Sequence, residues 1–199
     1  LEGRGYHVIK NITNVGYGTA LNQGMDLIET EYLVLMNPDV YVNERWLETL
    51  IACLDRHADR NAGIAGCKML SPSGMIVHEG STFMPNSEPV NIINLQWPNK
   101  YEQEYAAQAV CSACWIMKKE VYKVFHFDGI YGLGFYEDVD YCLQVRQKGY
   151  SVYYTPFASV THDMHSAWKK DPKTMNDLVA KNLKLFIDKW LSSGLLEPR

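Results

Sequence analysis

The segment Tyr32-Leu33-Val34-Leu35-Met36-Asn37-Pro38-Asp39-Val40 decides the fold. Its first five residues are apolar or aromatic, and they predict a buried strand over 32–36. Pro38 lacks the backbone N–H that a sheet ladder requires, so the strand should end before it. Two polar side chains, Asn37 and Asp39, follow at once. A carboxylate just past a buried strand is placed to hold a cation, although Asn-Pro-Asp is equally typical of a plain turn.

Strand and helix patterns alternate on both sides of this segment. The expected elements are a short strand at 7–9, a helix after the turn 14–18, a helix N-capped by Asn43, and a strand at 63–67. This β-α-β-α-β order predicts an α/β fold with a mostly parallel central sheet. Ligands of such sheets bind at the carboxyl ends of the strands, which is where Asn37 and Asp39 are expected.

The second half of the chain is less regular. Residues 71–108 are rich in Pro, Asn, Ser and aromatic residues, and we interpret them as a loop-rich insertion that serves acceptor recognition or is a plain surface insertion. A strand over 150–154 should stop at Pro156. The tail 169–199 contains an amphipathic helix over about 174–191. The whole chain, 1–199, is expected to form a single domain.

An acidic cluster, Tyr136-Glu137-Asp138-Val139-Asp140, follows a Gly-rich aromatic segment. Residues three apart share a helix face, so Glu137 and Asp140 should be neighbours while Asp138 points elsewhere. A carboxylate in a cleft can take the proton of an attacking hydroxyl. Acidic residues in a first helical turn also stabilise the helix dipole, so both interpretations stay open for this cluster.

His162 and the cysteines are weaker signals. His162 ends an extended piece, and a neutral imidazole can bind manganese or zinc, although a lone histidine is more often a hydrogen-bonded structural residue. Five scattered cysteines favour a reducing compartment over a disulfide framework. The pair Cys111-Ser-Ala-Cys114 runs into an apolar strand, and core packing is favoured over a metal or redox role because no second CxxC exists.

Composition and charge exclude several classes. The 199 residues carry a net charge of -4, which argues against nucleic acid as the main partner. No apolar run is long enough to span a membrane, and no secretory signal is expected at the start. From Lys169 onward there are seven basic and four acidic residues. A helix packed on the protein body is favoured there, with a membrane-surface or partner-binding helix as the alternative.

Several blocks of the chain resemble glycosyltransferase family 2, and among its members most closely the rhamnosyltransferase-like branch of bacterial polysaccharide assembly. On the amino-terminal side the resemblance rests on residues 14–24 and 35–39. On the acceptor side it rests on residues 127–129, 135–142, Arg146, 154–156 and 160–162. Each block alone is weak. Their common order, from Asn14 to about Ser166, makes the resemblance specific.

The resemblance implies a GT-A-like three-layer α/β/α sandwich. It also implies a UDP- or dTDP-sugar donor, a saccharide or lipid-linked saccharide acceptor, Mn2+ or Mg2+, and inversion at the anomeric carbon. The implied metal ligands are Asp39, as the retained acid of a DxD-like motif, and His162. The implied donor side consists of Asn22, Gly24, Asn37 and Asp39. Asp138 is the implied general base, and the acceptor side is assigned to Glu137, Asp140 and Trp115.

One departure matters for function. Family members normally begin with two further strand–helix units that hold much of the base and ribose, so the amino-terminal part of the fold is expected to be missing. The alternative function is a non-catalytic carbohydrate-binding or assembly module, or an inactive fragment. A metal-dependent phosphohydrolase is less supported, because no two-metal carboxylate cluster is evident. The expected location is the cytoplasm or, peripherally, the inner membrane face, and exposed apolar surface would favour a homo-oligomer.

Overall fold

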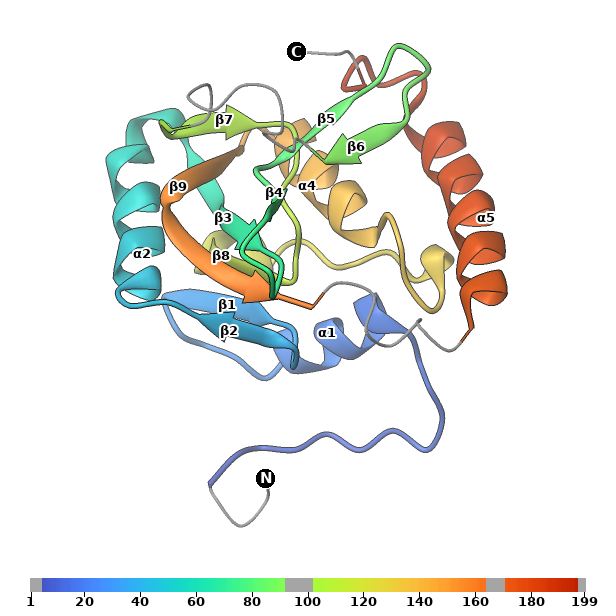
Figure 1. Ribbon diagram of the computed structural model, residues 1–199, viewed down its shortest axis with the longest axis horizontal. Coiled ribbons are helices and arrows are strands. Elements are labelled where there is room, and N and C mark those ends of the chain that lie inside the picture. The colour runs from blue at the N-terminus through green and yellow to red at the C-terminus, as the bar shows by residue number, and fades with distance from the viewer. Residues whose placement is uncertain (1–4, 92–101, 164–170, 197–199) are drawn as a thin grey trace.

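A computed structural model describes residues 5–91, 102–163 and 171–196. It shows a β-sheet between two layers of helices (Figure 1). The strands are β1 (Tyr32–Met36), β2 (Val40–Val42), β3 (Ala62–Leu70), β4 (Ile76–His78), β5 (Ser81–Phe83), β6 (Pro89–Asn91), β7 (Tyr105–Ala107), β8 (Cys114–Lys118) and β9 (Ser151–His162). The helices are α1 (Tyr17–Met25), α2 (Trp46–Arg56), α3 (Lys119–Tyr122), α4 (Glu137–Gln147) and α5 (Pro172–Trp190), with short 3-10 turns η2 (Ala58–Arg60) and η3 (Gly129–Tyr131).

The central sheet is mixed. Its strands lie in the order β1-β8-β3-β9-β2, with β4 added to β3 and β7 added to β9. Among these described pairs, β3 with β9 is parallel, and the others are antiparallel. The predicted α/β class is therefore confirmed, whereas the predicted mostly parallel sheet is wrong. The reason is β8, which comes from the second half of the chain and inserts antiparallel between β1 and β3.

Helices cover both faces of the sheet, as the three-layer prediction requires. On one face Leu50, Cys53 and Leu54 of α2 pack against β3, β8 and β9. On the other face α1, α3, α4 and α5 share a second core, whose largest members are aromatic. Trp115 of β8 and Tyr141 of α4 are fully buried in that second core. The two faces thus bury separate apolar cores.

The structure corrects several predicted boundaries of strands and helices. Residues 7–9, expected to be a strand, have no regular secondary structure. The N-cap of α2 is Arg45 rather than Asn43, whose side chain instead donates to Ser159 Oγ at 2.7 Å. Pro156 does not stop a strand, because β9 continues to His162. The register of β9 against β3 shifts between Thr155 and Ser159, so Pro156 lies where the pairing is interrupted and its missing N–H costs no ladder hydrogen bond.

The insertion 71–108, predicted to be rich in loops, also contains short strands. β5 and β6 form a separate two-stranded sheet, and β7 joins the edge of β9. Phe83 of β5 stacks on Phe186 of α5, with 6.1 Å between ring centroids. Residues 92–101 lie outside the described residues. The insertion is therefore joined to the body through both the central sheet and α5.

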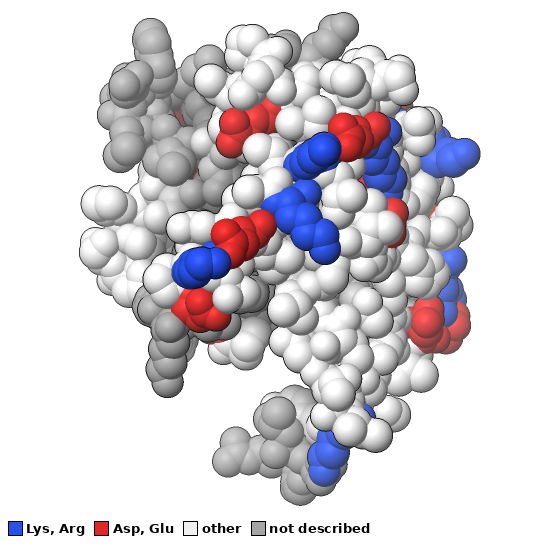
Figure 2. Space-filling model, turned by 90° about the vertical axis from the view of Figure 1, so that its right-hand side faces the viewer, with Lys and Arg blue, Asp and Glu red and all other residues white. Residues whose placement is uncertain are grey.

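Helix α5 packs on the body through Phe186 and Trp190, which are buried. This confirms the favoured interpretation of the tail; membrane association stays a prediction. Figure 2 looks onto this face, where Lys or Arg and Asp or Glu side chains of the described residues lie next to one another. Among the described helices, none combines the length and apolar character that a membrane crossing needs.

Asn182 connects α5 to the loop before α4. Its buried Nδ2 donates to the carbonyl oxygens of Tyr131, at 2.7 Å, and Gly134, at 2.6 Å. This loop ends in two aromatic residues with left-handed backbone, Phe135 at φ 74° and Tyr136 at φ 72°. Such φ values are costly for bulky side chains, so the surrounding contacts must hold the loop in place. Tyr136 is also the N-cap of α4, and the loop therefore sets where α4 begins.

Candidate active site

Asp39 and His162 meet at one end of the sheet. Asp39 lies between β1 and β2, and β2 pairs with the last residues of β9, so that Val40 is opposite His162. Asp39 Oδ1 is 3.4 Å from His162 Nε2, and their side chains are 28% and 9% exposed, respectively. The two predicted metal ligands, far apart in sequence, thus present a carboxylate oxygen and an imidazole nitrogen side by side. This donor pair fits a divalent cation such as Mn2+.

Asn37 follows β1, and contacts on two sides hold it. Its backbone N–H donates to Ala113 O at 2.9 Å. The hydroxyl of Tyr17, in the first turn of α1, donates to Asn37 Oδ1 at 2.9 Å. Ser112 Oγ in turn donates to the Tyr17 hydroxyl at 3.1 Å. Three segments, which contain Tyr17, Asn37 and Ser112, therefore converge just beyond the end of β1.

The same contacts extend to Asp138. The backbone N–H of Ser112 donates to Asp138 Oδ2 at 3.3 Å, and the N–H of Val139 donates to Oδ1 at 2.8 Å. A hydrogen-bonded chain thus runs from Asn37 through Tyr17 and Ser112 to Asp138. Burial raises the pKa of Asp138 above its ordinary value, and the two backbone hydrogen bonds oppose that rise. A raised pKa with a partly accessible carboxylate suits a general base.

Glu137 is the buried neighbour of Asp138. It is only 7% exposed, and its Oε2 has no hydrogen-bond partner within the described part of the chain. Burial, together with the charges of Asp138 and Asp140, raises the pKa of Glu137 to about 8. Glu137 therefore keeps its proton at neutral pH.

The burial and hydrogen bonds of Asp140 indicate a structural role. It is fully buried, and its carboxylate accepts hydrogen bonds from Tyr131 Oη at 3.0 Å, Gln144 Nε2 at 2.7 Å, Lys189 Nζ at 3.0 Å and Trp190 Nε1 at 2.6 Å. These four donors come from η3, α4 and α5. The contacts favour an anchor for α5 over the predicted acceptor-side role.

Trp115 lies in the apolar core. It is fully buried, and its ring packs against Phe127 and Tyr141, with centroid distances of 6.1 Å and 5.7 Å. The predicted acceptor-side role of Trp115 needs an accessible ring, which the structure does not provide. The physical reason is that all of β8 from Cys114 to Met117 is buried between the two helical layers.

The predicted donor residues on α1 are placed differently from Asn37. Asn22 forms two hydrogen bonds with the backbone of Phe127, both 2.9 Å long. Its amide is therefore engaged in holding the segment after α3. Gly24 faces open space, since a Cβ built on it would meet no atom within 4 Å. The structure places Asp39 beside His162, connects Asn37 to Asp138 through Tyr17 and Ser112, and gives Asn22 a structural contact.

Tyr17 and Ser112 are site residues that the sequence did not single out. Tyr17 stands in the turn 14–18, where Gly16 adopts φ +87° and a Cβ would come within 1.9 Å of Gly132 O. That close approach sets the start of α1 and so the position of the Tyr17 hydroxyl. Ser112 lies inside Cys111-Ser-Ala-Cys114, whose two cysteines drew attention away from it. A polar residue just before a buried strand was the available signal.

The mixed central sheet, with helices on both faces, matches the fold of GT-A-type glycosyltransferases. The sequence profile of Glycosyl transferase family 2 matches residues 2–125, which is more than half of the chain. The chain belongs to glycosyl transferase family 2. Asp138 and His162 lie beyond the matched segment, so their roles rest on the geometry described above.

The chain spans less than half of the length of each relative described here. "Uncharacterized protein y4gI" of Sinorhizobium fredii (strain NBRC 101917 / NGR234) is 28% identical over an alignment of 183 residues, and the match covers 81% of this chain and 19% of that protein. The solved structure of GalNAc-T7 with UDP, GalNAc and Mn2+ has a TM-score of 0.61 at 16% identity, over 78% of this chain and 31% of that one. The crystal structure of S. aureus TarS 1-349 has a TM-score of 0.44 at 17% sequence identity, over 71% of this chain and 40% of that one. The GalNAc-T7 likeness supports the fold alone.

Proposed function

We propose that the chain carries the catalytic site of a metal-dependent inverting glycosyltransferase. It transfers a sugar, with rhamnose among the candidates, from a UDP- or dTDP-sugar to a saccharide or lipid-linked saccharide acceptor in bacterial polysaccharide assembly. The observation that carries this proposal is the hydrogen-bonded chain from Asn37 through Tyr17 and Ser112 to Asp138. It connects a donor-side amide with a general base across one end of the sheet.

Asp39 and His162 would hold the cation. Mn2+ or Mg2+, when bound, offsets the negative charge that develops on the diphosphate leaving group. The similar fold of GalNAc-T7 was solved with UDP and Mn2+, which supports a cation of this type. Asn37, adjacent to Asp39, then lies where its amide can contact the donor sugar. The Tyr17 hydroxyl fixes the orientation of that amide by its hydrogen bond to Oδ1.

Asp138 takes the proton of the acceptor hydroxyl. As that hydroxyl oxygen attacks the anomeric carbon from the side opposite the leaving diphosphate, its proton passes to a carboxylate oxygen of Asp138. Two backbone N–H groups orient the carboxylate, and burial strengthens it as a base. Glu137 remains neutral beside it and adds no second negative charge at neutral pH. Proton removal by one positioned group is worth about 10²–10⁴-fold in rate.

Nucleotide binding is the decisive test. Calorimetric and thermal titrations would use UDP and dTDP with and without Mn2+, on wild type, Asp39→Ala, Asp138→Asn and the surface control Asp177→Asn. We expect Mn2+-dependent binding of one nucleotide in wild type and in the control, and its loss in Asp39→Ala. Asp138→Asn should bind nucleotide as wild type does, yet lose turnover of the matching nucleotide sugar by about 100-fold or more.

Two results would overturn the proposal. One is nucleotide binding whose affinity is the same with and without Mn2+ and in wild type and Asp39→Ala. The other is the absence of any nucleotide binding together with metal-independent sugar binding, which would identify a carbohydrate-binding module. The five cysteines are unpaired, which supports the proposed location in a reducing compartment. Self-association is tested by light scattering on the same samples.

A further inference from the structure

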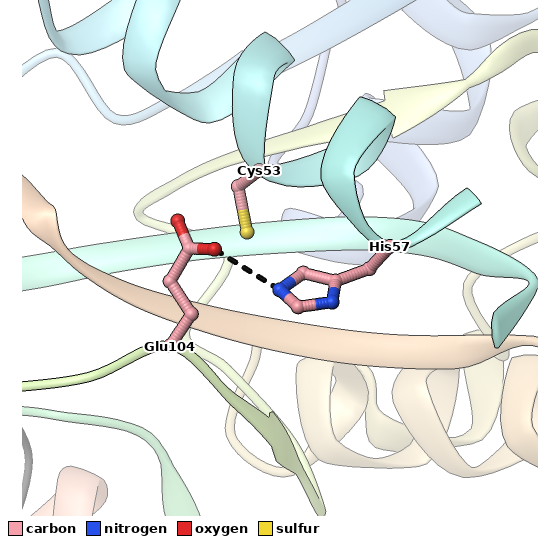
Figure 3. Close-up of side chains that lie close together, drawn as sticks. All are labelled: Cys53, His57 and Glu104. Carbon is pink, nitrogen blue, oxygen red and sulfur yellow. Dashed lines mark hydrogen bonds and ion pairs between the residues drawn. The ribbon is translucent and has the colours of Figure 1, made fainter. Parts of the chain in front are cut away.

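Cys53, His57 and Glu104 form a separate cluster on the face of the sheet that α2 covers (Figure 3). Cys53 is in α2, His57 follows the last residue of α2, and Glu104 precedes β7. One ligand atom from each residue lies within 4.8 Å of the others. His57 Nε2 and Glu104 Oε2 are 3.0 Å apart. The proposed active site, in contrast, involves the first residues of α4, which pack on the opposite face.

The three side chains are held in place before any ligand arrives. Cys53 is fully buried, and the Glu104 side chain is 8% exposed. The His57 ring lies flat on Tyr153, with 3.9 Å between centroids and 8° between planes, so that Nε2 points at Glu104. Thr155 Oγ1 donates to Glu104 Oε1 at 2.9 Å. Such outer contacts orient a ligand and reduce the cost of forming a metal site.

Arg56 is a positively charged neighbour of the cluster. Its Nε donates to Glu104 Oε2 at 3.1 Å, and its Nη2 forms an ion pair with Oε1. The guanidinium keeps the carboxylate ionised and opposes a second cation. With the Cys53 thiolate, however, the site offers two negative charges against one positive charge. Because the Arg56 side chain is 50% exposed, it can keep its contact with Oε1 while Oε2 turns to another partner.

We propose that Cys53, His57 and Glu104 bind a zinc ion, with water as the fourth ligand. A thiolate, an imidazole and a carboxylate together favour Zn2+ over Mg2+ or Ca2+, which prefer oxygen ligands alone. Binding transfers the Cys53 thiol proton to solvent, because the thiolate is the ligand. The ion would join α2 to the segment before β7. This site is independent of the cation proposed at Asp39 and His162.

Cobalt and zinc titrations of the reduced, metal-free chain test the proposal. Co2+ bound at this site should give a sulfur-to-cobalt absorption band, which Zn2+ then removes. Cys53→Ser should lose that band and weaken zinc binding at least tenfold, and His57→Asn and Glu104→Gln should weaken it as well. Cys67→Ser is the matched control, because Cys67 is also fully buried in the core under α2. Cys67→Ser should bind zinc as wild type does, and Asp39→Ala should retain the sulfur-to-cobalt band.

Two outcomes overturn the proposal: wild-type chain that takes up no stoichiometric zinc, or Cys53→Ser that retains the sulfur-to-cobalt band. If Cys53→Ser fails to fold, X-ray absorption of zinc-loaded wild type decides instead. One sulfur with nitrogen and oxygen neighbours supports the site, and a shell of nitrogen and oxygen alone refutes it. Because Asp39→Ala abolishes the proposed nucleotide binding but not this zinc site, failure of one proposal is distinguishable from failure of the other.

Discussion

Asp39 Oδ1 and His162 Nε2 lie 3.4 Å apart because β2 pairs antiparallel with the final residues of β9. The register shift between Thr155 and Ser159 lets β9 continue past Pro156 to His162. The position of His162, the proposed metal ligand at the end of β9, thus depends on a local irregularity in the middle of that strand.

We expect His162→Ala to weaken Mn2+ binding at least tenfold, because it removes one of two ligands and leaves the carboxylate of Asp39 alone. The measurement is Mn2+ titration followed by electron paramagnetic resonance. His126→Ala is the matched control, since His126 contacts Asp26 at 2.9 Å on the surface. Equal Mn2+ affinities of the two variants would contradict the assignment of His162.

Glu137 should make stability depend on pH. Its pKa rises from an ordinary value of 4.5 to about 8 in the folded protein, so unfolding releases a proton between these values. The free energy of unfolding should therefore fall as pH rises through this window, by up to about 1.4 kcal/mol per pH unit, and level off above it. Glu137→Gln should flatten that dependence. Urea unfolding from pH 5 to 9 measures it, with exposed Glu48→Gln as the control that should retain the wild-type slope.

Gly16 and Gly24 should respond oppositely to a methyl group. Gly16→Ala places Cβ 1.9 Å from Gly132 O in a left-handed backbone, so we expect a loss of more than about 2 kcal/mol or no folded protein. Gly24→Ala meets open space within α1 and should stabilise by about 0.5–1 kcal/mol. Thermal melting tests both. Weaker nucleotide binding by a stable Gly24→Ala variant would support the donor role predicted for Gly24, and unchanged binding would contradict it.

Asp140 should matter for stability rather than for the chemistry. Asp140→Ala leaves Lys189 and Trp190 without their buried acceptor, and we expect a loss of about 3–5 kcal/mol in urea unfolding. The surface control Asp177→Ala breaks an exposed pair with Lys173 and should cost less than about 0.5 kcal/mol. Asp140→Asn keeps the shape and one oxygen, so its loss should fall between the two. Similar values for Asp140→Ala and Asp177→Ala would refute the anchor.

Local patterns predicted elements well and pairings poorly. Strand β1 begins and ends as expected, because an apolar run and Pro38 define it within a few residues. The antiparallel pairing of most strands could not be predicted in the same way. Strand β8 lies between β1 and β3, although it is distant from both in the sequence. Strand pairing is a non-local property that the order of elements does not determine.

The candidate site shows the same division. Asp39, Asn37 and Asp138 were identified because each stands at an informative position in a short motif. Tyr17 and Ser112 were not, because their importance comes from contacts between three distant segments. Cys53 and His57 did carry a local signal, the four-residue spacing that puts two ligands on one helix face. Glu104, the third residue of the proposed zinc site, is distant in the sequence and could be found only from the folded structure.

The hydrogen bonds from Asn182 to the loop before α4 have a thermodynamic consequence. The left-handed conformations of Phe135 and Tyr136 are retained only while α5 holds the loop, so α5 and the first turn of α4 should open as one cooperative unit. Native-state hydrogen exchange would then give the protected amides of both elements one common opening free energy. The geometry of the general base would thereby be as stable as the docking of the last helix.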